Sequence, residues 1–183
     1  LHTPLGRKYV KVLRVYTSDT EQNICKLALQ MGASVHSHER MTQKEAEGCA
    51  QDMRRLKPDL LFSINNLKRI PGTVINEFHM GSFNLHPGRL PEYAGLHVAQ
   101  WAIRNGDSLT EATLHWMNSD IDEGAVAYTK VVAIEKSDTG LTLLNRTMES
   151  GVTCFVRLIR DALLGRPIPR TPQNMAKFHI YRS

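Results

Sequence analysis

The chain has 183 residues, of which 42% are hydrophobic and 22% are charged, and its formal net charge is +5. These values are ordinary for a globular protein, and folding at this length buries roughly 70% of the unfolded surface, which excludes disorder and fibrous structure. No apolar run approaches the about 20 residues of a membrane-spanning helix, and the first residues do not resemble a secretory signal. We therefore expect a cytoplasmic protein without a membrane partner. Lys and Arg are spread along the chain rather than clustered, so we expect no nucleic-acid partner.

The first half of the chain alternates between strand and helix patterns. Strands are predicted at 9–17, 33–38 and 60–64, and helices at 21–31, 42–56 and from Pro71 through Phe78. Thr42 and Glu45 have the spacing of a capping box, which places a helix start there. Residues 60–64 are almost entirely apolar, as in a strand buried on both faces of a parallel sheet. The alternation predicts an α/β fold with a Rossmann-like, doubly wound, mainly parallel sheet and helices on both faces.

The second half adds strands that follow each other directly. A central strand is predicted at 82–86, a helix at 98–105, strands at 111–117 and 125–134, and a long helix from about 140 to 163. The two adjacent strands favour an antiparallel or mixed edge of the sheet. The long helix has an apolar stripe that we expect to face the core: Leu141, Leu144, Met148, Val152, Phe155, Ile159 and Leu163. We expect one domain over 1–183, with a core at about 9–168 and an irregular tail at 169–183.

The central strand carries the most informative side chains. Asn84 and His86 lie two residues apart, so they share one face of a strand that Pro87 ends. Open α/β sheets bind ligands at the carboxyl ends of their strands. A carboxamide beside an imidazole suits a reaction that builds negative charge on a carbonyl oxygen. The polar loop 118–124 follows the next strand and can bring Asp122 toward His86, although the spacing alone equally fits an acidic surface turn.

Two motifs together resemble a known family. Asn84-x-His86-Pro-x-x-Leu-Pro-x-x-x-Gly95 is followed some 35 residues later by Asp120-x-Asp122-x-Gly124. The combination resembles the catalytic domain of the formyltransferases that use 10-formyltetrahydrofolate, and the resemblance runs from about Val10 to Pro169. Its implied activity is transfer of a formyl group from the folate to a primary amine, a step of one-carbon metabolism and biosynthesis.

The resemblance also implies roles for individual residues. Asn84 and His86 would donate hydrogen bonds to the oxyanion of the tetrahedral intermediate, and Asp122 would orient the ring and take the proton that the amine loses. The folate would bind between two loops, largely through backbone groups, at six residues: Ser63, Ile64, Asn65, Asn66, Asp120 and Ile121. The only co-substrate expected is 10-formyltetrahydrofolate, and no metal is expected.

The chain also departs from the family pattern. The family's usual first strand and helix are not recognised before Tyr9, which would leave an apolar sheet edge open. We expect either a fragment of a larger chain, a degenerate domain, or a partner that covers this edge. The missing first loop argues against glycinamide ribonucleotide as the acceptor, and no C-terminal β-barrel like that of the methionyl-tRNA member is recognised.

Several functions remain open at this point. The acceptor amine could belong to a nucleotide-linked amino sugar, or to an amino acid or aminoacyl group carried by a biosynthetic synthetase. The same three residues would also serve a 10-formyltetrahydrofolate hydrolase, in which water accepts the formyl group. A third alternative is an inactive binding module that retains the fold.

Overall fold

The computed structural model describes residues 10–17, 23–37, 41–64, 66 and 68–182. Its strands are β1 (Arg14–Thr17), β2 (Ser34–Ser37), β3 (Leu60–Ile64), β4 (Gly81–His86), β5 (Ala94–Gly95), β6 (Leu109–Trp116), β7 (Val126–Ala133) and β8 (Ile180–Tyr181). Its helices are α1 (Asn23–Gln30), α2 (Gln43–Leu56), α3 (Gly72–Ile75), α4 (Val98–Arg104), α5 (Gly140–Leu163) and a 3₁₀ turn, η1 (Met175–Lys177). None of the described helices is long and apolar enough to cross a membrane.

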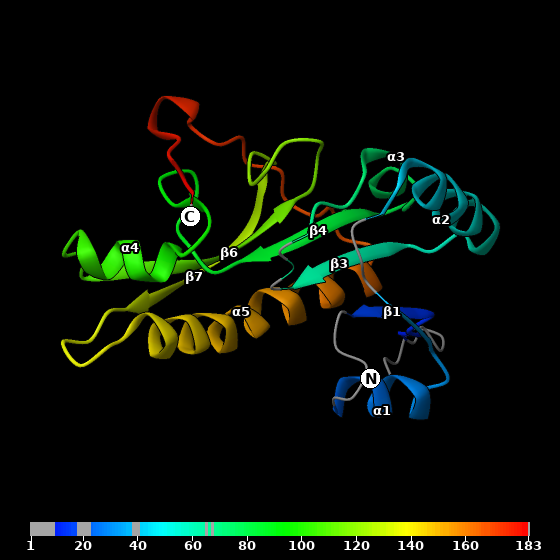
Figure 1. The fold of residues 1–183 in the computed structure, drawn as a ribbon, viewed down its shortest axis with the longest axis horizontal. Coiled ribbons are helices and arrows are strands. Elements are labelled where there is room, and N and C mark those ends of the chain that lie inside the picture. The colour runs from blue at the N-terminus through cyan, green and yellow to red at the C-terminus, as the bar shows by residue number, and fades with distance from the viewer. Residues whose placement is uncertain (1–9, 18–22, 38–40, 65, 67, 183) are drawn as a thin grey trace.

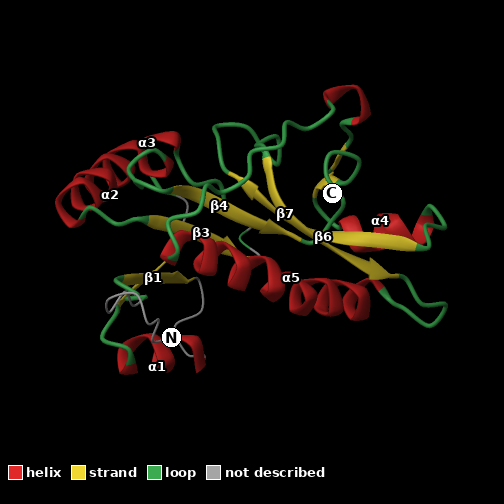
Figure 2. Cartoon of the chain, turned by 180° about the vertical axis from the view of Figure 1, so that it is seen from behind, coloured by secondary structure: helices red, strands yellow, loops and turns green. Residues whose placement is uncertain are grey.

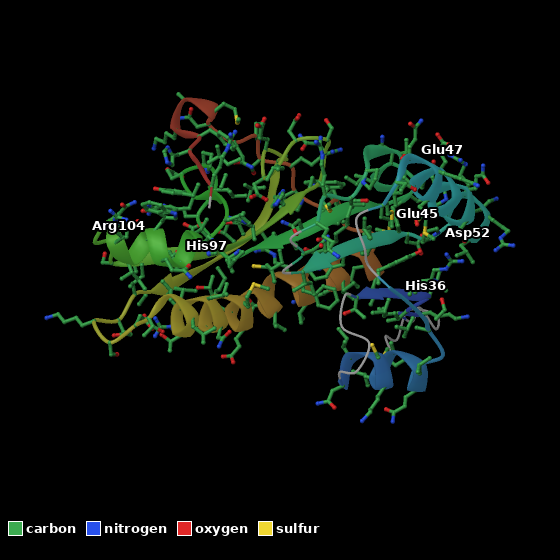
Figure 3. The ribbon with its side chains drawn as sticks, in the orientation of Figure 1. His36, Glu45, Glu47, Asp52, His97 and Arg104 are labelled. Atoms are coloured by element: carbon green, nitrogen blue, oxygen red, sulfur yellow. The ribbon has the colours of Figure 1, made fainter. Side chains whose placement is uncertain are left out.

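The capping box at the start of α2 forms as predicted. The Thr42 side chain accepts a hydrogen bond from the backbone N–H of Glu45, and the Glu45 carboxylate accepts one from the backbone N–H of Thr42. These two bonds satisfy donors that have no partner inside the helix, which makes Thr42 the first boundary of α2. Figure 3 shows Glu45 near this end of the helix.

The central sheet has the strand order β3-β4-β6-β7. β3 and β4 are parallel, whereas β4 with β6 and β6 with β7 are antiparallel, so the predicted mixed edge is present. Figure 2 shows α5 running along one face of this sheet. The hydroxyl of Ser82, on β4, donates to the carbonyl of Ile75 at the end of α3. Because Ser82 points away from the α5 face, helices cover both faces of β4, in agreement with the expected α/β fold.

The predicted core stripe of α5 is only partly correct: Leu144 and Met148 pack against the core, but the buried line of the helix runs beside them. The buried residues of α5 are Leu143, Thr147, Gly151, Cys154 and Leu158. Leu141 and Val152, which the prediction placed inward, are 65% and 53% exposed. A Cβ at Gly151 would come within 2.8 Å of the Leu85 methyl groups, so the helix approaches β4 through small side chains. The larger residues Met148 and Phe155 pack beside this line rather than on it.

The parallel strands do not form one continuous sheet among the described residues. β1 and β2 pair with each other in parallel, but neither is hydrogen-bonded to β3. Figure 1 shows this pair next to β3, with α1 on its far side. Side chains join it to α2: Arg14 lies 2.9 Å from Asp52, which Figure 3 labels, and the Tyr16 hydroxyl lies 3.6 Å from the sulfur of Cys49. The β3 edge facing β1 therefore has no strand partner in the described part of the chain.

Candidate active site

A row of polar side chains crosses the central sheet on the face opposite α5. The registers pair Ser63 with Asn84, and Asn84 with His115, so the three residues lie side by side on β3, β4 and β6. Paired residues on neighbouring strands point to the same face. His86 follows Asn84 on this face, and its register partner is Thr113. Phe83 and Leu85, the apolar residues that alternate with Asn84 and His86 along β4, point toward α5.

The ring of His86 is held from both sides. Nε2 lies 2.6 Å from the backbone oxygen of Tyr93, and Nδ1 lies 3.4 Å from Oδ2 of Asp122. A carbonyl oxygen can only accept a hydrogen bond, so Nε2 carries the proton and Nδ1 is the nitrogen that can gain one. Gly88 permits this arrangement, because a Cβ there would come within 2.8 Å of Nε2.

A tight turn places Asp122 against the two histidines. Asp122 has a φ of 58°, in the left-handed region that few residues other than glycine adopt. Its Oδ2 accepts a hydrogen bond of 2.9 Å from the backbone N–H of Gly95, and its Oδ1 lies 3.4 Å from Nε2 of His115. Two residues on, a Cβ at Gly124 would collide with the backbone oxygen of Trp116. The turn therefore requires glycine at 124 to bring the carboxylate into the site.

His115 completes the cluster, and the motif analysis did not identify it. Its Nδ1 lies 2.9 Å from the backbone oxygen of Trp116, and its Nε2 lies 3.2 Å from Nδ2 of Asn84. The Trp116 carbonyl can only accept, so Nδ1 carries a proton. A neutral ring then accepts a hydrogen bond at Nε2 from the Asn84 amide, whereas a protonated ring directs an Nε2 proton at Asp122. His115 is 3% exposed. The signal for it was weak: a histidine between two apolar residues, Leu114 and Trp116, on a predicted strand that also carries Glu111 and Thr113.

Burial and charge set the protonation of this cluster. Burial lowers the pKa of His86 below its ordinary value, while the charge of Asp122 opposes the effect. Burial raises the pKa of Asp122, but the contacts with His115, His86 and the Gly95 N–H outweigh it and lower the pKa to about 2. Near neutral pH the ring of His86 is therefore uncharged and Asp122 is ionised. Together the two side chains can accept one proton.

The described residues among the six expected to bind folate lie at the end of β3, in the segment after it, and in the loop between β6 and β7; one hydrogen bond joins the two regions. The guanidinium of Arg69, in the segment after β3, donates to the backbone oxygen of Ser119. Ser63 is buried at the end of β3, whereas Asp120 is exposed in the other loop. Ile64 and Ile121 expose 53% and 54% of their surface.

The side chain of Asn66 is already hydrogen-bonded within its own segment. The side-chain oxygen of Asn66 accepts from the Lys68 backbone N–H and its amide donates to the Lys68 carbonyl, so the Asn66 side chain shapes its own loop. Asn65 lies outside the described residues. Each of the two regions therefore exposes one isoleucine side chain, and the hydrogen bond from Arg69 to Ser119 joins the regions.

Comparisons with known proteins report on the family and the fold of the chain. Residues 5–159 match the formyl transferase family. A glycinamide ribonucleotide transformylase from Symbiobacterium toebii has 20% identity and a TM-score of 0.77, over 88% of this chain and 79% of its own. A sugar N-formyltransferase from Shewanella has 20% identity and a TM-score of 0.69, over 92% and 62%. An N-formyltransferase from Helicobacter canadensis, in complex with folinic acid and dTDP-3-aminofucose, has 23% identity and a TM-score of 0.63, over 85% and 52%. The family match covers most of the sequence, and the chain belongs to the formyl transferase family.

Proposed function

We propose that this chain transfers the formyl group of 10-formyltetrahydrofolate to a primary amine of a small-molecule or carrier-linked acceptor. The observation that carries the proposal is the arrangement of Asn84, His86 and Asp122 at the carboxyl end of β4. The amide of Asn84 contacts His115, and His115 lies next to Asp122. Asp122 and His86 together can take up one proton. Formyl transfer needs these two functions, because it builds charge on an oxygen and removes a proton from an amine.

The reaction begins when the amine nitrogen attacks the formyl carbon. Asn84 uses one N–H on His115, and its second N–H would donate to the oxyanion that develops. Asp122, next to Nδ1 of His86, would take the proton that the attacking nitrogen loses. The intermediate then collapses, the bond between the formyl carbon and N10 of the folate breaks, and N10 receives a proton. The protein ends the cycle in the state in which it began.

His86 has a different place in this scheme from the one expected from sequence. Its Nε2 proton is donated to the Tyr93 carbonyl, so the ring has no second N–H directed at a substrate oxygen when it is neutral. We propose that Nδ1 shares the proton taken up by Asp122 and that the Tyr93 bond holds the ring in place. The folate would bind at the touching loops after β3 and around Asp120, where Ile64 and Ile121 are exposed.

The acceptor amine can be identified by screening candidate amines. We propose an amino sugar linked to a nucleotide, or an aminoacyl group on a carrier. The test is to incubate the protein with 10-formyltetrahydrofolate and a panel of such amines, and to follow tetrahydrofolate release by absorbance. Asp122→Asn is the matched control and should release it at least about 100-fold more slowly. Release of formate without any amine would instead identify a hydrolase. Folate binding without turnover on any amine or on water would identify a binding module.

A further inference from the structure

The C-terminal segment 169–182 contacts the turn that carries Asp122. The side-chain nitrogen of Gln173 lies 2.7 Å from the backbone oxygen of Asp122 and 2.7 Å from that of Gly124. Both oxygens can only accept, so the amide nitrogen of Gln173 must face the turn and donates both hydrogen bonds. One side chain, about 50 residues away in sequence, thus bridges the residues on either side of Glu123.

These two bonds act where the backbone conformation is costly. Asp122 is in the left-handed region, with a φ of 58°, although it has a Cβ. Such a conformation persists only where the surrounding structure enforces it. In this conformation the carboxylate reaches Gly95, His86 and His115 together. A turn that relaxed toward an ordinary φ would direct the carboxylate elsewhere, because the Cα–Cβ bond rotates with the backbone.

The same segment also holds the other side of the carboxylate. Residues Ile180 and Tyr181 of β8 pair in parallel with Ala94 and Gly95 of β5, and Gly95 donates its backbone N–H to Asp122. The Tyr181 ring stacks on Tyr93, with centroids 5.4 Å apart. Residues 169–182 therefore bind both to the backbone of the Asp122 turn and to the strand whose N–H holds its carboxylate.

We propose that Gln173 is a positioning residue of this site, which keeps Asp122 in the conformation that directs its carboxylate at His86 and His115. Gln173 acts through the backbone of Asp122 and needs no contact with a substrate. The inference rests on the proposed function for its effect on rate, but its effect on geometry can be measured without turnover.

The test uses two substitutions of nearly equal size. Gln173→Met keeps the length of the side chain and removes both donors, and Gln173→Glu replaces the amide with a group that donates only when protonated. Lys177→Ala is the control, because it removes a neighbouring contact of the same segment, in which an exposed ammonium lies 3.9 Å from Glu92. Circular dichroism and thermal melting report whether each variant folds.

Two readouts separate positioning from support of the fold. In Gln173→Met we expect kcat to fall about 10- to 100-fold, as for a displaced catalytic group, with little change in KM for the folate. In Gln173→Glu we expect kcat relative to the unmodified protein to recover as the pH falls toward the range in which a glutamic acid is protonated.

The second readout is the titration of the His86 ring by NMR. The groups facing that ring are Asp122, His115 and the Tyr93 carbonyl. Asp122 and the Tyr93 carbonyl both raise the pKa of the ring, and of these two only Asp122 is held by Gln173. Moving the carboxylate away should lower the pKa of His86 further.

The outcomes are distinguishable. If Gln173→Met leaves both kcat and the His86 titration as they are in Lys177→Ala, the positioning role is overturned. If no amine is formylated but the titration still shifts in Gln173→Met, the proposed function fails and the positioning of Asp122 stands. Should Gln173→Met not fold, Gln173→Glu decides, because an unchanged titration and a rate without pH-dependent recovery would overturn the role.

Discussion

Asn84 and His115 face each other across β4 and β6, with the amide nitrogen of Asn84 3.2 Å from Nε2 of His115. This contact orients the amide, because one N–H is fixed on the ring and the other keeps a defined direction. Nε2 of the same ring lies near Asp122, so His115 connects the donor and the acid. Removal of its nitrogens should therefore disturb both.

We expect His115→Phe to lower kcat about 10- to 100-fold while the protein remains folded, because an aromatic ring is kept and three polar contacts are lost. His79→Phe, at an exposed histidine between α3 and β4, should have no effect on the rate. Steady-state kinetics with 10-formyltetrahydrofolate and an accepted amine provide the measurement. Equal rates in the two variants would show that His115 does not orient the site.

Asn84→Ala should reduce kcat about 100- to 1,000-fold, the usual effect of removing one donor from an oxyanion site. KM for the folate should change little, since the hydrogen bond strengthens only as charge develops. Asn76→Ala, at an exposed residue that ends α3, serves as the matched control. A large rise in KM with an unchanged kcat would place Asn84 in binding instead.

Asp122→Asn should lower kcat about 100- to 10,000-fold, because the amide cannot take the proton from the amine. The substituted side chain can still accept from the Gly95 N–H, so the turn should remain closed. The comparison requires thermal melts of both proteins beside their rates. Full activity in a folded Asp122→Asn would remove this residue from the mechanism.

The stability of the protein should fall as the pH is lowered. The pKa of Asp122 is about 2 in the folded protein against an ordinary 3.8, so its contribution of about 2 kcal/mol is present above 3.8 and is lost as the pH falls through about 2. The pKa of His86 is lowered from 6.5, so its contribution is complete above that value and declines below it. Urea unfolding over a pH series measures both. Asp122→Asn should lack the more acidic component, and an identical pH profile would contradict its assignment.

Two helix glycines should respond in opposite directions to a larger residue. At Gly48 in α2 a Cβ meets nothing within 4 Å, so Gly48→Ala should stabilise the protein by about 1 kcal/mol through helix propensity. At Gly151 in α5 a Cβ comes within 2.8 Å of Leu85, so Gly151→Val should destabilise by about 1 to 3 kcal/mol through overpacking. Denaturant titrations of both variants check the signs. A neutral Gly151→Val would show that α5 does not approach β4 as closely as described.

Local signals account for the parts of the fold that were predicted well. β3 begins and ends at the predicted residues, because Pro58 and Asp59 stop the preceding helix and an uninterrupted apolar run follows. The α2 cap depends on two residues three positions apart, Thr42 and Glu45, and on their backbone groups. Asn84 and His86 share a face because they are two residues apart on one strand.

The rest depends on contacts between distant segments. The buried line of α5 was mistaken because small residues such as Thr147 and Gly151 allow close approach, and a hydrophobic stripe cannot reveal this. His115 enters the site through strand register, which the sequence of one strand does not specify. Gln173 lay in a tail that was expected to be irregular, and no local pattern relates it to Asp122.

The separation of β1 and β2 from the four-stranded sheet has a consequence for how the molecule opens. Amide protons in this small pair should exchange with deuterium well before those of β4 and β6, since a parallel pair held mainly by side chains to α2 can loosen by itself. Asn84, His86 and His115 lie on β4 and β6, in the slower-exchanging part. Opening of this pair should thus precede, and not require, loss of the contacts around Asp122.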